Sequence, residues 1–126
     1  MTRIHVLEKV KTRKENIGLT LDNISKLSHL GNRTVTRFFA GEDVKLSTLE
    51  KITTIMGLDF AGNELIDIET LRDKRAKEKA IYIVSLVQDT SALEMQGLEN
   101  NEIQLLIEDT KKQFLTGEYQ KNLWAS

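Results

Sequence analysis

The chain has no proline, and its apolar residues recur every three or four positions between corners marked by glycine. Proline breaks helices because it lacks the backbone N–H donor, so its absence favours uninterrupted ones. Apolar residues at positions i, i+3 and i+4 are typical of helices with one face in a core. A chain of 126 residues forms one domain, or a small domain with an appendage, and can bury a substantial core. We therefore predict an all-α fold.

Two short helices are expected before residue 30. Residues 3–16 have apolar positions at helical spacing, and Gly18 is suited to end this helix. Thr20 can cap a second helix, because its hydroxyl can accept from the free N–H groups of the first turn. The residues expected to face inward are Ile4, Leu7, Val10, Leu21, Ile24 and Leu27.

A third helix is expected from Gly31 or Asn32 to a stop at Gly41, with Val35 and Phe38 facing inward. The side chains left outside are short polar or basic ones, where an ordinary solvated helix would favour Glu and Lys. They are Asn32, Arg33, Thr34, Thr36 and Arg37. Side chains of this kind can form hydrogen bonds with something other than the protein itself.

A fourth helix is expected to begin at Ser47, which has the spacing of a capping box with Glu50, and to close at Gly57. These four helices and a looser segment after them form the predicted first domain, residues 1–66. Residues 1–60 contain ten Lys/Arg and seven Asp/Glu, a balance of +3, whereas residues 61–126 contain eight and twelve, a balance of −4. This split indicates different partners for the two parts of the chain.

A spaced pattern of about a dozen positions lies within residues 19–58 and runs without a gap from Leu19 to Gly41. Its members are Leu19, Thr20, Ile24, Ser25, Leu30, Val35, Phe38, Gly41, Met56, Gly57 and Leu58. This stretch, a third of the chain, resembles the helix-turn-helix of the Cro/repressor type, also called the XRE family. Three features depart from the family pattern. Leu21 replaces a common glutamine, His29 replaces a common glycine, and two acidic residues, Glu42 and Asp43, follow the third helix.

The resemblance implies that residues 1–66 bind double-stranded DNA and that the third helix enters the major groove. Arginine can donate two parallel hydrogen bonds to guanine, asparagine can pair with adenine, and threonine can touch a thymine methyl group. The implied base-reading residues are Asn32, Arg33, Thr36 and Arg37. Contacts to the DNA backbone are expected from Thr20, Lys26, Thr34 and Lys45, with Arg13 and Lys14 as further cations. Two alternatives stay open: surface ion pairs for the two arginines, and helix capping by Asn32.

Residues 67–126 are expected to form a helical region for dimerisation or partner binding. Residues 70–88 begin as a charged, helix-forming run, and residues 80–87 are then apolar except for Ser85. A helix that is apolar on all sides must be buried on all sides, which would place this segment at the centre of a packed assembly. The alternative is a buried strand, because the same residues are rich in β-branched and aromatic side chains.

The end of the chain is also expected to be helical. Residues 91–98 indicate a short turn, and Asn100 or Asn101 can cap a longer helix that ends at Gly117. The apolar stripe of that helix is Ile103, Leu106, Ile107 and Phe114. A dimer or partner surface is expected at Ile81, Val84, Val87, Leu123 and Trp124. Docking of Trp124 against its own domain is an equal alternative, because either arrangement removes the ring from water.

Several kinds of chemistry find no support in the sequence. The chain has no cysteine, which excludes disulfides and thiolate metal sites and is compatible with a reducing cytoplasm. His5 and His29 lack the spacing of metal ligands, and no glycine loop or carboxylate pair marks a catalytic site. No signal peptide is recognisable, and no apolar run is long enough to cross a membrane. We expect a cytoplasmic protein that is not an enzyme and has no metal or cofactor.

One recognition helix contacts only a few base pairs, and related proteins act as two-fold dimers with these helices about 34 Å apart. We therefore expect a homodimeric DNA-binding transcriptional regulator that represses by occupying operator half-sites. An alternative is an antitoxin that regulates its own operon and neutralises a toxin protein through its C-terminal half. A third interpretation is a protein-interaction module whose DNA-binding surface is degenerate.

Overall fold

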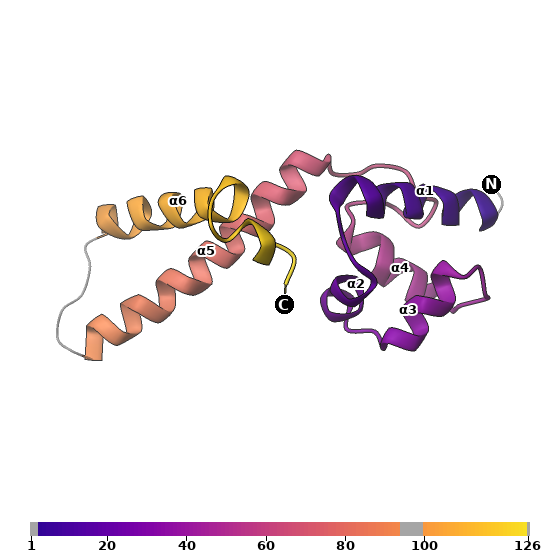
Figure 1. Ribbon diagram of the computed structural model, residues 1–126, viewed down its shortest axis with the longest axis horizontal. Coiled ribbons are helices and arrows are strands. Elements are labelled where there is room, and N and C mark those ends of the chain that lie inside the picture. The colour runs from indigo at the N-terminus through magenta and orange to yellow at the C-terminus, as the bar shows by residue number, and fades with distance from the viewer. Residues whose placement is uncertain (1–2, 94–99, 126) are drawn as a thin grey trace. The chain divides into compact units, whose positions relative to one another are not determined.

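The computed structural model describes the backbone of residues 3–93 and 100–125, and the side chains of residues 5–87 and 100–125. Its elements are α1 (Arg3–Ile17), α2 (Leu21–Ser28), α3 (Asn32–Phe39), α4 (Leu46–Ile55), α5 (Ile68–Leu93), α6 (Asn100–Thr116) and the 3₁₀ turn η1 (Gln120–Asn122), as Figure 1 shows. Besides these helices, the described residues contain one isolated antiparallel bridge, between Leu58 and Glu64. The prediction of an all-α fold is confirmed.

The chain divides into two compact units. Unit 1 contains the residues up to Leu71 together with the tail that begins at Trp124, and unit 2 contains Arg72–Leu123. The division therefore falls inside α5, whereas the sequence suggested a boundary between residues 66 and 67. The predicted boundary lies instead just before the first residue of α5, Ile68.

The four short helices of unit 1 share one hydrophobic core, to which each of them contributes. Its buried members are Val6, Val10, Ile17, Leu19, Ile24, Val35, Phe38, Ile52, Met56, Leu58 and Leu71. Leu7 and Leu27 pack against this core while remaining partly exposed. The expectation that Leu21 faces inward is wrong, because α2 buries Ile24, Ser25 and Ser28 and leaves Leu21 36% exposed. The side chain of Ile4 lies outside the described residues.

Sequence signals located most of the helix ends in unit 1. Thr20 caps α2 as predicted: its Oγ1 accepts from the N–H of Asn23 at 3.0 Å, and the Asn23 side chain accepts from the N–H of Thr20 at 3.1 Å. Gly41, with φ at +88°, follows the end of α3. The predicted capping box at Ser47 is wrong. The carbonyl of Lys45 already accepts from the third and fourth residues after it, so α4 begins at Leu46 without a side-chain cap.

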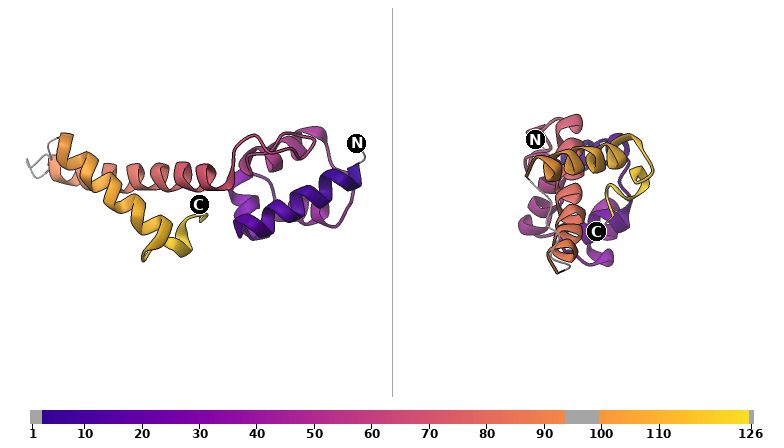
Figure 2. Two further views of the ribbon diagram at one scale, coloured as in Figure 1. Left: turned by 90° about the horizontal axis from the view of Figure 1, so that it is seen from above. Right: turned by 90° about the vertical axis from the view of Figure 1, so that its left-hand side faces the viewer.

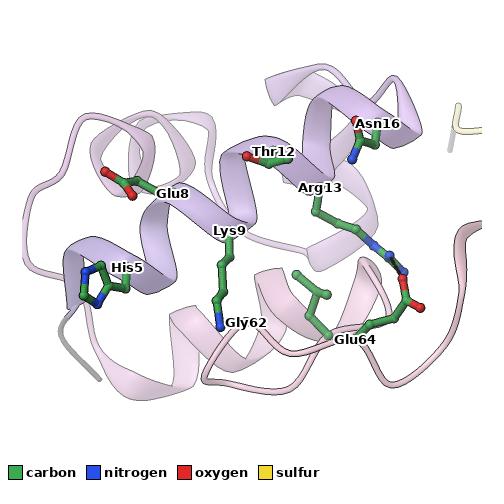
Figure 3. Close-up of a pocket in the computed structure, with 9 residues that line it drawn as sticks. His5, Glu8, Lys9, Thr12, Arg13, Asn16, Gly62 and Glu64 are labelled. Atoms are coloured by element: carbon green, nitrogen blue, oxygen red, sulfur yellow. Dashed lines mark hydrogen bonds and ion pairs between the residues drawn. The ribbon is translucent and has the colours of Figure 1, made fainter.

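Arg13 is a buried structural residue, and its predicted contact with DNA phosphate is wrong. Its side chain is 7% exposed and reaches from α1 to the segment after α4, as Figure 3 shows. Nε donates to the carbonyl of Met56 at 2.9 Å, and the two terminal nitrogens donate to Glu64 and to the carbonyl of Ile66. Gly57 leaves room for this arrangement, because a Cβ there would lie 3.0 Å from the Ile66 carbonyl oxygen. Arg13 thus fastens the 56–66 segment to α1.

We expect Arg13→Met to lower the free energy of unfolding by about 2–3 kcal/mol, because it leaves two backbone carbonyls without their donors while retaining an apolar stem. Urea unfolding followed by circular dichroism measures this loss. Lys11→Met on the same helix is the control; Lys11 is exposed, so its change should stay within about 0.5 kcal/mol. Equal stability of the two variants would contradict a structural role for the guanidinium.

The loop between α4 and α5 is organised around the carboxylate of Asp59. The backbone N–H groups of Asn63 and Ala61 both donate to Oδ1 at 2.9 Å, and the Asn63 side chain donates to Oδ2 at 3.3 Å. The hydrogen bond from the Asn63 backbone is the largest of the effects that hold the pKa of Asp59 below its ordinary value. Asp59 therefore closes this turn most effectively when it is ionised.

Because the pKa of Asp59 is lower in the folded chain than in the unfolded one, its contribution to stability is present above the unfolded pKa of about 3.9 and is lost as the pH falls through the folded value. Asp59→Asn removes this titration. Between pH 6 and pH 3, the wild-type protein should therefore lose more unfolding free energy than the variant does. Parallel losses in urea titrations at the two pH values would contradict the assignment.

Unit 2 is a pair of helices in which α6 returns across α5, as Figures 1 and 2 show. Ala80 and Val84 of α5 and Ile107 of α6 are buried where the helices meet, and we call these three residues the α5–α6 seam. Ile103 and Leu106 pack against the seam and Phe114 is buried, so the predicted apolar stripe of α6 is confirmed. An ion pair of 2.8 Å between Lys111 and Asp73 joins the two helices and raises the pKa of Lys111.

The alternative of a strand at residues 80–87 is ruled out, since this segment lies within α5. The first three residues of the turn predicted at 91–98 belong to α5, and residues 94–98 lie outside the described residues. The expected burial on all sides is not found among the side chains that the structure describes. Ile81, Tyr82, Leu86 and Val87 are 42%, 66%, 51% and 45% exposed.

Candidate nucleic-acid interface

The corner between α2 and α3 is built by three residues, His29 to Gly31. His29 adopts the left-handed conformation at φ 58° and ψ 34°, and its N–H is directed at the carbonyls of Lys26 and Ser25. The N–H of Leu30 donates to the Ser25 carbonyl at 3.1 Å, and the hydroxyl of Ser25 donates back to the Leu30 carbonyl. These bonds satisfy the end of α2 and set the direction in which α3 leaves.

Two side chains fix the rotation of α3 about its own axis. Val35 is completely buried and Phe38 is 4% exposed, and both belong to the core of unit 1. The ring of Phe38 meets that of Phe39 edge to face, with centroids 5.0 Å apart. Because residues three apart lie on the same side of a helix, this burial turns the opposite side of α3 outward.

The four residues expected to contact bases all lie on the outward side of α3. Asn32, Arg33, Thr36 and Arg37 are exposed, and Thr34 is partly buried. Within the described part of the chain, neither arginine has a hydrogen bond or ion pair through its guanidinium, so the alternative of surface ion pairs finds no support there. The N-cap of α3 is Gly31, which leaves Asn32 inside the first turn rather than in the capping position.

The residues expected to contact the DNA backbone are less uniform. Thr20 is exposed at the N-terminus of α2, where its Oγ1 serves as the cap. Lys26 forms an exposed ion pair of 3.1 Å with Asp22, one turn earlier in the same helix, which is typical of an ordinary solvated surface. Lys45 is exposed at the N-cap of α4. Glu42 and Asp43, which would repel phosphate, are exposed between α3 and α4.

The residues expected at a dimer or partner surface are divided by the structure. Ile81 and Val87 are exposed on α5, whereas Val84 lies in the α5–α6 seam and Leu123 is only 1% exposed. Trp124 is partly buried and packs against the core of unit 1, the unit to which it is assigned. Val84 and Leu123 therefore have no surface to offer a partner. Tyr82 and Leu86, which the sequence analysis did not single out, are more exposed than either Ile81 or Val87.

A polar hollow of about 490 Å³ lies between α1 and the 58–64 segment, and Figure 3 shows the side chains that line it. Its cations are already engaged: Lys9 Nζ donates to Asn63 Oδ1 at 3.1 Å, and Arg13 is bound to Glu64. No group of acidic, histidine or cysteine side chains suited to a metal ion occurs in the described residues. Among the helices that the structure describes, none is long and apolar enough to traverse a bilayer.

Comparisons with known proteins assign neither a family nor a function to this chain. No protein-family model matches the chain, and neither a curated protein nor a solved structure matches it. What the chain does must therefore be argued from its own residues.

Because a residue with a Cβ is strained in the left-handed conformation, we expect His29→Gly to raise the free energy of unfolding by about 0.5–1 kcal/mol. His29→Ala is the matched control: it removes the imidazole but keeps the strain, so it should give no gain. Thermal unfolding of the three proteins measures the difference. If His29→Ala raised the free energy of unfolding as much as His29→Gly, the destabilisation at this corner would come from the imidazole side chain and not from backbone strain.

Proposed function

We propose that this protein is a sequence-specific DNA-binding transcriptional regulator that acts as a homodimer and represses by occupying operator half-sites. The observation that supports the proposal most strongly is the outward side of α3. There Asn32, Arg33, Thr36 and Arg37 are exposed, while Val35 and Phe38 anchor the helix from behind. A helix of this width fits the major groove, and short side chains near its start can reach base edges.

Each outward side chain has a suitable partner on DNA. The guanidinium groups of Arg33 and Arg37 can bond guanine O6 and N7, the amide of Asn32 can bond adenine N6 and N7, and Thr36 can contact a thymine methyl group. The N-terminus of α2, capped by Thr20, can hold a phosphate with its free backbone N–H groups. Phosphate contacts of this kind would set the register, and the base contacts would supply the sequence preference.

The expected mechanism is competition for a site on DNA. Two copies would place their α3 helices in successive major grooves on one side of the duplex, about 34 Å apart. A dimer held in this way covers the operator and prevents other proteins from using it. The alternative in which the C-terminal half neutralises a toxin protein draws on the exposed apolar residues of α5. Co-purification separates the two, because a different protein recovered with the chain in a fixed ratio would support the antitoxin.

Arg33→Ala should weaken binding to the preferred operator by about 1–3 kcal/mol, or roughly 10- to 150-fold in Kd, and relax the preference at one base pair of each half-site. Footprinting of genomic fragments with the purified full chain identifies the operator, and fluorescence anisotropy then gives the Kd. Lys77→Ala is the control, because Lys77 is exposed on α5 in the other unit, and its Kd should match wild type.

The wild-type Kd should also rise steeply with salt, because Lys and Arg contacts to phosphate release bound counterions. Anisotropy titrations between about 50 and 200 mM salt measure the slope, because the loss of affinity is large over this range. Affinity independent of salt, or an Arg33→Ala footprint identical to wild type, would reject α3 as the recognition element and favour a protein-interaction module.

A further inference from the structure

A continuous uncharged surface lies on the side of α5 that faces away from α6. It consists of Ile81, Tyr82, Ser85 and Leu86, and we call it the α5 outer patch. At 100° per residue these four positions cover roughly 140° of the helix, centred opposite Ala80 in the α5–α6 seam. Its three large side chains are 42%, 66% and 51% exposed in chain order. α6 therefore covers one side of this apolar segment and leaves the other in water.

The α5 outer patch can be buried at little polar cost. Residues 80–87 contain no charged side chain. The hydroxyl of Ser85 donates to the carbonyl of Ile81, one turn earlier, at 2.7 Å, so it needs no partner from another molecule. The hydroxyl of Tyr82 is at the tip of a long ring, where it can stay at the wet edge of an interface. On this side of α5 the charged residues include Glu78, one turn before Ile81, and Lys74, two turns before it, and they give the patch a polar rim.

We infer that the α5 outer patch is the surface on which a second copy of this chain docks, with the α5 helices of the two copies crossing near Ser85. The inference rests on the proposed function for its biological use, since binding to two half-sites requires a dimer. Its physical basis is the shape and chemistry of the patch itself. A small residue between large ones forms a shallow groove, and a two-fold axis through it lets the ridges of each helix fill the groove of the other.

The size of the α5 outer patch also fits a second copy. Three large side chains at about half exposure leave on the order of 300 Å² of apolar surface in water, comparable to the largest patch on a typical monomer. Two copies would hide about twice this area, or roughly 600 Å², and the surrounding polar rims would have to supply the rest of the roughly 1,200 Å² at which specific interfaces begin. Each of two identical chains offers the other the same uncharged patch, and a contact between two such patches needs no deep pocket.

Ser85→Cys tests the crossing point directly, because the natural chain has no cysteine. Two residues facing each other across the axis bring their Cβ atoms to the 3.5–4.5 Å, roughly, that a disulfide needs. Mild oxidation of the full-length variant should convert most of it to a covalent dimer. Leu105→Cys is the control, since Leu105 is 70% exposed on α6 but lies outside the patch. Cross-linking of Ser85→Cys no faster than of Leu105→Cys would overturn the proposed crossing.

Leu86→Glu tests the contribution of the patch to association. Sedimentation equilibrium should show wild type as a dimer at micromolar concentration and a Kd at least 100-fold higher for the variant, with unchanged helical circular dichroism. Phe60→Glu is the control, because Phe60 is 62% exposed in unit 1 and should leave the dimer intact. A monomeric wild type, a dimer that survives Leu86→Glu, or a dimer lost in Phe60→Glu would each overturn the inference.

The same samples distinguish this inference from the proposed function. A wild-type dimer that is broken by Leu86→Glu but shows no salt-dependent affinity for any genomic fragment would sustain the interface and reject DNA binding. A wild-type monomer that binds an operator and loses affinity in Arg33→Ala would sustain DNA binding and reject the interface. A monomer that purifies in a fixed ratio with a different protein would also reject a second copy as the occupant of the patch.

Discussion

The burial of Val35 and Phe38 in the core of unit 1 is the contact on which the interpretation of α3 depends. A helix of eight residues has little stability of its own, so its position is set by what it packs against. With these two side chains held in the core, α3 cannot rotate without exposing them. The polar residues on the opposite side of α3, Asn32, Arg33, Thr36 and Arg37, are consequently presented outward in a fixed order. A fixed order is what recognition of base edges requires.

Contacts elsewhere in unit 1 support that orientation. Before it, the left-handed His29 and the reciprocal bonds of Ser25 and Leu30 turn the chain sharply out of α2. Further along, Arg13 holds the segment after α4 against α1. A buried guanidinium is favourable only when its donors are satisfied, and here they bond two carbonyls and a carboxylate. Stability and presentation of the outward surface are therefore properties of the same small core.

Much of unit 1 could be predicted because its signals are local. Glycine positions, the Thr20 cap and the spacing of apolar residues depend on neighbours in sequence. The predicted start of α4 was wrong because two possible first turns compete, one capped by the Ser47 side chain and one closed by the carbonyl of Lys45. Only the folded chain decides between these two starts. Arg13 was misjudged for a related reason. A cation on a charged helix looks solvent-facing, and its partners lie more than 40 positions away in sequence.

In unit 2, local sequence patterns do not predict which residues cover the apolar segment of α5. The apolar run in α5 predicted burial on all sides, which the described residues do not show, and a sequence cannot say whether such cover would come from the same chain. The structure divides the run: Ala80 and Val84 are buried against α6, while Ile81, Tyr82 and Leu86 of the α5 outer patch are 42%, 66% and 51% exposed. If α3 contacts DNA as proposed, one copy of the chain reaches only a few base pairs. A second copy docked as proposed would cover the apolar surface of α5 and would also double the surface available to DNA.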